Sequence, residues 1–293
     1  MASDATAPTP TPAPAPAPTP APAPAPAATP TPPADPPLFS LFSDLGQKDL
    51  MRLGVLVFVI NIPLLHYLVR HVLMAQPTTA EVPFHDDFQR ADVGPNYWST
   101  GGHWRIENGE VHAPGVKNNP LWLQVALPRD VAVEFDVRSQ SPEGDIKFEL
   151  FGDGENHSSG YCFIFGGWNN QISTVSRLNE HGVSFDAMGN GMQGQTPQQQ
   201  VVAGRSLSEM YSTGYFGAKA EWRVERRDIR VTIGQRYHMR IEARGNDLAW
   251  FIDGQPVFRI TDPYRFGGKH HDRLGLSSWD SDLYFDNIDI KPL

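Results

Sequence analysis

Acidic side chains that could carry out proton-transfer chemistry occur on two segments that alternate like β-strands. In the first segment, Glu134 and Asp136 share one face. In the second, Asp145, Lys147 and Glu149 share one face. General acid–base catalysis needs titratable groups whose environments move their pKa values apart. Instead, we expect Lys147 to form salt bridges with its two acidic neighbours on a solvated sheet face.

Aromatic and amide side chains that could bind a sugar gather in the segment Gly166-Gly167-Trp168-Asn169-Asn170. Binding pockets combine aromatic walls with a few well-placed polar groups. The predicted ligand-binding residues are Trp168, Asn169, Asn170, Arg177 and Trp122, and Trp98 and Trp279 could line the same face. The alternative is that each tryptophan belongs to the core of a β-domain.

The sequence contains few other signals for catalysis or cofactor binding. There is no Gly-x-Ser-x-Gly, phosphate loop or His-Glu-x-x-His motif. Cys162 lies in an apolar run and is expected to be a small core residue. No cofactor is predicted, apart from a structural calcium that carboxylate oxygens could hold. Its candidate ligands come from the two terminal strands: Asp87 and Asp286 first, then Asp86 and Asp289.

The elements that must position these groups are short strands between residues 84 and 293. Predicted strands include 131–138, 146–151, 161–165, 172–178 and 222–233, with Gly-rich and Asp-Gly turns between strands. Many short strands and no amphipathic helix predict a mainly β domain, an antiparallel two-sheet jelly-roll sandwich.

The sequence of this β segment resembles the concanavalin A-like lectin/glucanase superfamily over about 84–293. The resemblance rests on an Asp253-Gly254 hairpin, then Leu274-Gly275-Leu276, then the terminal strand 283–288. It implies a concanavalin A-like sandwich with a lectin, hydrolase or structural role. A retaining glucanase of this superfamily would carry the pattern Glu-x-Asp-x-x-Glu, with its two glutamates as nucleophile and acid. Here Glu134 and Asp136 match, but Ser139 replaces the second glutamate. Hydrolysis of that type is therefore not expected.

Residues 50–75 are strongly apolar and predict a single transmembrane helix, in which Pro63 permits a kink. The alternative is a buried helix of a soluble domain, but the sequence offers no second helix to pack against it. Lys48 and Arg52 precede the most apolar part of this span, residues 53–69, and Arg70 follows it, which favours a cytoplasmic N-terminus. The β-domain would then be periplasmic or extracellular.

Two polar residues interrupt the predicted span, and polar groups in lipid are costly unless they meet a partner. We expect Asn61 and His66 to contact a neighbouring helix of a membrane assembly. Alternatively, His66 is an interfacial histidine near the helix end, or it ligates the metal of a porphyrin or chlorin.

The remaining segments are predicted to be connections. Residues 1–38 hold more than half of the 27 prolines and are expected to be disordered or polyproline-like, either as a solvated tail or as a ligand for a proline-recognising partner. Residues 39–49 form a juxtamembrane segment and 76–83 a linker. The long loop 188–220 either binds a partner or covers a pocket, or it is an insertion with a short helix near 206–211 packed on its own domain.

A net charge of −9 argues against a nucleic-acid partner, which would require clustered Lys and Arg. The predicted function is a non-catalytic, membrane-anchored structural or binding subunit that docks onto other proteins of a membrane complex. A cell-surface carbohydrate-binding module is the alternative, and a glycan-active hydrolase is a third.

Overall fold

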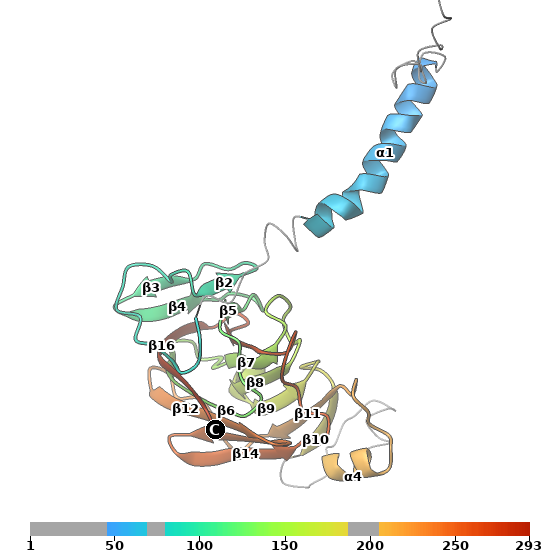
Figure 1. Cartoon of the computed structure of the whole chain (residues 1–293). Helices are drawn as coiled ribbons and strands as arrows, with labels where there is room; N and C mark the ends of the chain where they lie inside the picture. Colours follow the sequence, from blue (N-terminus) through green and yellow to red (C-terminus); the bar gives the residue numbers. More distant parts are fainter. Residues whose placement is uncertain (1–45, 69–79, 187–204) are drawn as a thin grey trace, which may run out of the picture. The chain divides into compact units, whose positions relative to one another are not determined.

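The computed structural model describes residues 46–68, 80–186 and 205–293, in two units divided after Leu73. The first unit carries helix α1 (Gln47–Leu68), and the second carries all the described strands, as Figure 1 shows. The predictions for the tail 1–38, for most of the juxtamembrane segment and the linker, and for residues 187–204 lie outside the described residues.

Helix α1 begins slightly before the predicted residue 50 and contains Pro63. Its stretch Gln47–His66 is long and apolar enough to cross a membrane, and none of it is buried. The amide nitrogen Nδ2 of Asn61 donates to the carbonyl oxygen of Val57, 2.7 Å away and one turn earlier. One N–H donor of the Asn61 side chain is thus satisfied within the helix.

The first sheet is built from antiparallel pairs. Its strands, in spatial order, are β14 (Gln255–Thr261), β13 (Asp247–Ile252), β12 (Arg236–Arg244), β6 (Val131–Ser139), β16 (Asp282–Pro292), β4 (Glu110–Pro114) and β3 (Arg105–Glu107), and β1 (Phe84–Asp86) also pairs with β16. The predicted Asp253-Gly254 hairpin joins β13 to β14, with φ of 50° and 74° at these two residues. Positive φ at both central positions is what a tight hairpin turn requires.

The second sheet contains one parallel pair. Its order is β10 (Val183–Asp186), β11 (Trp222–Arg226), β9 (Ile172–Arg177), β8 (Tyr161–Gly166), β7 (Ile146–Gly152), β15 (Arg273–Ser277), β5 (Leu121–Leu123) and β2 (Tyr97–Ser99). The predicted two-sheet sandwich is confirmed, but β10 and β11 run parallel because a long connection separates them. The strand predicted over 222–233 ends early, at Arg226, and Val231 binds Asn170 instead.

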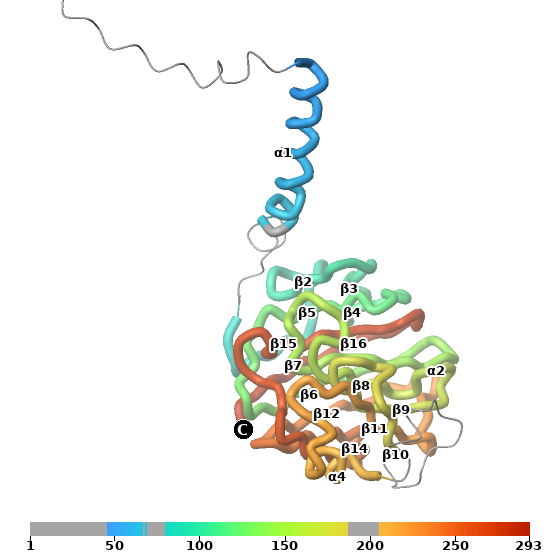
Figure 2. The backbone as a smooth tube through the Cα atoms, turned by 90° about the vertical axis from the view of Figure 1, so that its right-hand side faces the viewer, coloured from blue at the N-terminus to red at the C-terminus, as the bar shows by residue number. Residues whose placement is uncertain are grey.

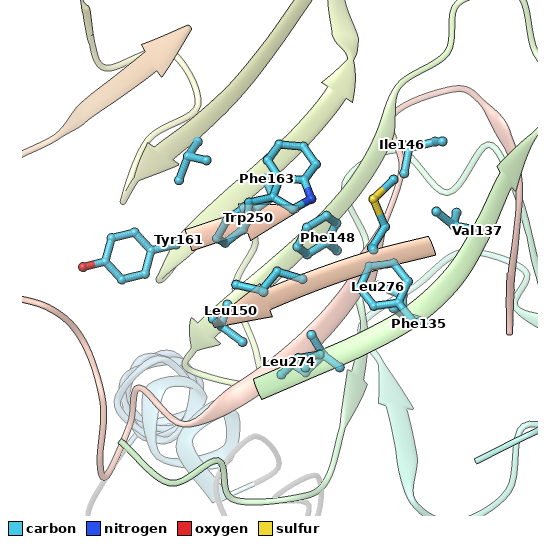
Figure 3. Close-up of a cluster of buried hydrophobic side chains, with 14 of the residues drawn as sticks. Phe135, Val137, Ile146, Phe148, Leu150, Tyr161, Phe163, Trp250, Leu274 and Leu276 are labelled. Carbon is cyan, nitrogen blue, oxygen red and sulfur yellow. The ribbon is translucent and has the colours of Figure 1, made fainter. Parts of the chain in front are cut away.

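The core lies between the two sheets, which Figure 2 shows face to face. Figure 3 shows Phe135, Phe148, Phe163 and Trp250 pointing toward one another. The ring centroids of Phe135 and Phe148 are 5.0 Å apart, and those of Phe163 and Trp250 are 5.5 Å apart. Each fully buried side chain of this size contributes about 1.5–3 kcal/mol.

The described part of the long loop contains helix α4 (Leu207–Ser212), drawn beside β10 in Figure 1. Ser206 caps it by accepting a hydrogen bond from the Glu209 N–H at 3.1 Å. Met210 is fully buried, and the indole N–H of Trp222 donates to the Tyr211 hydroxyl at 2.8 Å. The alternative of a short helix packed on its own domain is confirmed for this part.

Candidate functional site

A cavity of about 440 Å³ opens on the outer face of the second sheet, at the ends of β7 and β8. It is lined by aromatic and charged side chains: Trp168, Trp279, Glu143, Asp145, Glu180, Asp280, Lys147 and His181. Pockets of about 300–1,000 Å³ with aromatic walls and a few convergent polar groups are typical small-ligand sites.

Strand alternation along β7 places the polar groups on this side of the sheet. Phe148 and Leu150 point into the core (Figure 3), so Lys147 and Glu149 point to the opposite face. That face was expected to be solvated, yet Lys147 is 2% exposed and Glu149 is 0% exposed. Loops carrying Asn118, His157 and Glu180 lie over it, and we call it the covered face.

Lys147 is held by the loops rather than by its strand neighbours. Its ammonium donates to Glu180 Oε2 at 2.9 Å and to Asn118 Oδ1 at 2.8 Å. The predicted salt bridges to Asp145 and Glu149 are thus replaced by one to Glu180. Burial by itself would lower the pKa of Lys147, but the surrounding carboxylates raise it. The side chain is therefore a fixed cation and not a nucleophile.

His157 closes the other end of the covered face. Its Nδ1 lies 2.6 Å from Glu149 Oε1, and its Nε2 lies 3.6 Å from Glu180 Oε2. Burial by itself would lower the pKa of His157, but hydrogen bonds to these two carboxylates raise it to about 9. For Glu180, burial acts to raise the pKa, and the contacts with His157 and Lys147 lower it well below its usual range. At neutral pH these groups are an imidazolium held by Glu149 and a carboxylate held by Lys147.

The segment predicted to bind a ligand forms a left-handed turn, α2 (Gly167–Asn170). Trp168, Asn169 and Asn170 have φ of 51°, 58° and 59°. Each left-handed residue other than glycine costs free energy, and such strain persists only where the surroundings fix it. Here two hydrogen bonds join Asn170 to Val231. Asn170 Nδ2 donates to the Val231 carbonyl oxygen at 2.7 Å, and the Val231 backbone N–H donates to Asn170 Oδ1 at 2.8 Å.

Two neighbours support the Trp168 ring. The Arg223 guanidinium lies 5.1 Å from the ring centroid, and the His181 ring meets it edge-on at 5.9 Å. Arg223 is fixed in turn by Glu225 at 2.5 Å and by the Ser184 hydroxyl at 2.6 Å. The guanidinium contact and the edge-on imidazole hold the indole in place, while other atoms of the indole line the cavity.

Trp279 follows β15 and is 54% exposed at the cavity. Its backbone N–H donates to Asp145 Oδ2 at 2.7 Å, which ties the loop to the start of β7. Burial raises the pKa of Asp145, although Lys147 and this N–H oppose the shift. A carboxyl in such surroundings holds a proton more readily than a surface aspartate does.

The structure brings Trp168 and Asn169 to the cavity, but not the other predicted ligand-binding residues. Asn170 instead holds the turn in place through its hydrogen bonds to Val231. Arg177 is fully buried, pairs with Asp262 at 2.9 Å and binds backbone carbonyls, so it holds the domain together. Trp122 is fully buried as well, because its indole fills the space above two glycines of neighbouring strands.

The carboxylates singled out first, Glu134 and Asp136, lie on the outer face of the first sheet, away from the cavity's lining. His238 bridges them, with Nδ1 2.9 Å from Asp136 and Nε2 3.2 Å from Glu134, and Arg240 also pairs with Glu134. Arg236 continues this exposed set of ion pairs. We call it the open face.

The first two proposed calcium ligands have protein partners in the structure. Asp87 accepts from the Gln89 N–H at 3.2 Å, and Asp286 pairs with Arg236 at 3.2 Å. Within the described residues, no group of three or more His, Cys, Asp or Glu side chains could hold a metal ion.

Sequence reasoning missed Glu180, which lies in an irregular turn after β9 where no strand pattern signals a role. Trp279, which the sequence suggested as a lining residue, does line the cavity from the turn after β15. Cys162 is buried as predicted, but on the covered face, opposite Glu149 in the ladder. Burial raises the pKa of its thiol well above the usual value. Chemically, the cavity offers two indoles, several carboxylates and neutralised cations, a set suited to binding a polar ring.

Comparisons with known structures find β-sandwich proteins. A carbohydrate-binding module, CBM66 from Bacillus subtilis, is 12% identical, with 67% of this chain and 95% of that chain covered and a TM-score of 0.43. A Bacillus subtilis protein of unknown function with a galectin-like fold is 8% identical, with coverages of 71% and 94% and a TM-score of 0.42. The apo Crh5 transglycosylase is 13% identical, with coverages of 74% and 86% and a TM-score of 0.44. These identities and scores are too low to transfer a function.

No curated protein matches the sequence. A family model, described as the 3-keto-alpha-glucoside-1,2-lyase-like domain, matches residues 92–291 and therefore most of the sandwich and of the chain. By this match the chain belongs to the family of 3-keto-alpha-glucoside-1,2-lyase-like domains.

Proposed function

We propose that this protein is a non-catalytic, membrane-anchored binding subunit. In this proposal α1 lies in the bilayer and contacts helices of a membrane protein complex, and the sandwich lies on the periplasmic or extracellular side. The positive charges at Lys48 and Arg52, at the N-terminal end of the span, support this orientation.

The observation that carries the proposal is the apolar surface of α1. Large hydrophobic side chains are exposed on every side of the helix, among them Leu50, Phe58, Ile60 and Leu65. Such a surface is stable only in lipid or against other apolar helices.

Two polar groups on α1 point to a protein partner as well as to lipid. Asn61 uses one N–H within the helix, and its carboxamide oxygen accepts nothing from the described residues. His66 lies near the end of the described helix and is exposed. A partner helix that satisfies such groups gains roughly 0.6–2 kcal/mol per interhelical hydrogen bond.

Purification of the full-length chain from its own membranes in a mild detergent tests the proposal. We expect stoichiometric membrane proteins to co-migrate with it, and the double variant Asn61→Leu plus His66→Leu to lose them. The matched control, Leu56→Val plus Ile60→Val, changes the opposite side of the helix and should keep them. Complete assembly of the double variant would show that Asn61 and His66 are not the contact.

The proposed lack of catalysis is supported by the state of the buried titratable groups at the cavity. Lyase chemistry beside a ketone requires a free base to remove a carbon-bound proton and an acid to protonate the leaving group. The buried bases beside the cavity are not free, because His157 is bound to Glu149 at 2.6 Å and Lys147 to Glu180 at 2.9 Å. We expect no turnover of a 3-keto-α-glucoside by the full-length protein; measurable release of the aglycone would contradict the proposal.

The cavity favours a second candidate function, the binding of a glycan. Trp168 and Trp279 line it together with several carboxylates, and aromatic rings with convergent polar groups suit a sugar ring. Binding of the detergent-solubilised full-length chain to an immobilised glycan array tests this function. Trp168→Ala should abolish the signal, while Trp122→Phe, which changes a buried indole outside the lining, should preserve it.

A further inference from the structure

We propose that the cavity selects a sugar that carries a protonated amine, such as a hexosamine, over the corresponding neutral sugar. This inference rests on the glycan-binding candidate and adds the charge of the ligand. It follows from the carboxylates of the lining, from the ion pair with Lys147 that neutralises Glu180 among them, and from the two tryptophans beside them.

The lining has more acidic groups than basic ones. Glu143, Asp145, Glu180 and Asp280 are acidic, whereas Lys147 is the basic residue that faces them, together with His181. Lys147 forms its ion pair with Glu180, at 2.9 Å. That pair is neutral overall, and burial favours the protonated form of Asp145, so of the other three carboxyls Glu143 and Asp280 at the mouth carry the charge that a ligand meets.

These three carboxyls are incompletely satisfied. Asp145 is buried and accepts one hydrogen bond, from the Trp279 N–H to Oδ2. Glu143 and Asp280 are exposed at the mouth and accept no hydrogen bond from the described residues. An exposed carboxylate without a protein donor remains free to form a charge-assisted hydrogen bond with a ligand's ammonium group.

The aromatic part of the lining reinforces the same preference. An ammonium group near an indole face is attracted by the ring's quadrupole, most strongly for tryptophan. Arg223 already makes this contact with Trp168 from outside the lining. Trp279 is 54% exposed and carries no such neighbour among the described cation–ring contacts. An amine placed between Trp279 and the acidic groups would have both kinds of attraction.

The size of the cavity suits one sugar with its substituent. A volume of about 440 Å³ lies in the lower half of the range for small-ligand sites. Neighbouring Asn169 adds an amide that can bind hydroxyl groups. The indoles would then contact the ring, and the carboxylates the amine.

Calorimetric titration of the full-length protein in detergent tests the charge preference. Glucosamine, glucose and N-acetylglucosamine are compared at mildly acidic pH and low salt, since the three share a ring and differ in charge at one substituent. We expect glucosamine to bind about tenfold more tightly than the other two, the increment of one favourable charge contact. Added salt should reduce the preference, because partly exposed charges are screened.

Matched variants locate the effect. Glu143→Gln plus Asp280→Asn should abolish the preference, so that glucosamine and glucose bind this variant with equal affinity. Glu81→Gln plus Asp87→Asn removes the same charge outside the lining and should preserve the tenfold preference. Both pairs change exposed side chains, so the fold is not at risk.

The outcomes separate this inference from the function on which it rests. Equal affinities for the three sugars would overturn the charge preference while supporting a glycan site. Absence of binding to these sugars and to the glycan array would overturn both. Tetramethylammonium binding as tightly as glucosamine, with no binding of glucose, would overturn the sugar part of the proposal.

Discussion

The outer faces of the two sheets carry similar sequences but have different environments. On the open face, Glu134 and Asp136 alternate with core residues and meet His238 and Arg240 in solvent. On the covered face, Lys147 and Glu149 alternate in the same way but are buried under loops. Strand alternation thus predicts which side chains leave the core, whereas the loops decide whether those side chains reach water. The cavity lies on the face where loops cover charged strands.

The largest expected difference between the two faces is the cost of removing a cation. Lys147→Ala leaves Glu180 and its neighbours without their buried partner, and we expect a loss of about 3–5 kcal/mol in the free energy of unfolding. Arg240→Ala removes a partner that solvent still reaches, and it should cost about 0–1 kcal/mol. Denaturant unfolding of both variants in detergent measures the difference. Equal costs would show that burial does not distinguish the two faces.

The pH dependence of stability should reflect the ionisation of His157 on the covered face. The pKa of His157 is about 9 in the folded protein, above its ordinary value of 6.5. A raised pKa stabilises the folded state fully below pH 6.5, and this contribution is lost as the pH rises through about 9. The shift corresponds to about 3 kcal/mol. Unfolding measured across this range should therefore show a decline, which His157→Gln flattens. A decline of the same size in the variant would assign it to other groups.

Two asparagines with left-handed backbones offer a matched pair. Asn170 clasps Val231 beside the cavity, and Asn287, with φ of 51°, donates to Asp136 at 2.9 Å on the open face. Replacement by alanine costs the backbone the same in both places. We expect Asn170→Ala to lose about 1–3 kcal/mol more, because it leaves partly buried groups unpaired. Thermal unfolding provides the measurement, and a larger loss at Asn287 would reverse the comparison.

The smallest expected effect is that of salt on the coupling energies of the ion pairs. A double-mutant cycle on Arg240 and Glu134 should give a coupling below about 1 kcal/mol that fades as the ionic strength rises. The same cycle on Lys147 and Glu180 should keep its coupling, since buried pairs are poorly screened. A salt-sensitive coupling at Lys147 would mean that water reaches the covered face in solution.

Much of the fold could be predicted from local pattern. Alternation and the Asp253-Gly254 turn predicted the sandwich, because strand period and positive φ are properties of a few adjacent residues. An apolar run predicted a helix of membrane-spanning length over most of α1. The parallel pairing of β10 with β11 could not be read in this way, since it depends on how a long connection crosses the sheet.

The site was predictable only in part. Trp168 and Asn169 were recognised because an aromatic residue flanked by amides is unusual in a turn. Arg177 has the same residue type as a sugar-binding arginine, yet strand parity turns it into the core toward Asp262. Glu180 and Trp279 reach the cavity through tertiary folding of loops, and no spacing in the sequence relates them to Lys147.

The pairing of β1 with β16 has a consequence for biosynthesis. β16 lies in the middle of the first sheet and binds β6 and β4 as well as β1. It is also the last strand of the domain to leave the ribosome. Strand β1 and one edge each of β4 and β6 therefore lack their final partner until the end of the domain has been synthesised, and a chaperone near the emerging chain would find these edges free.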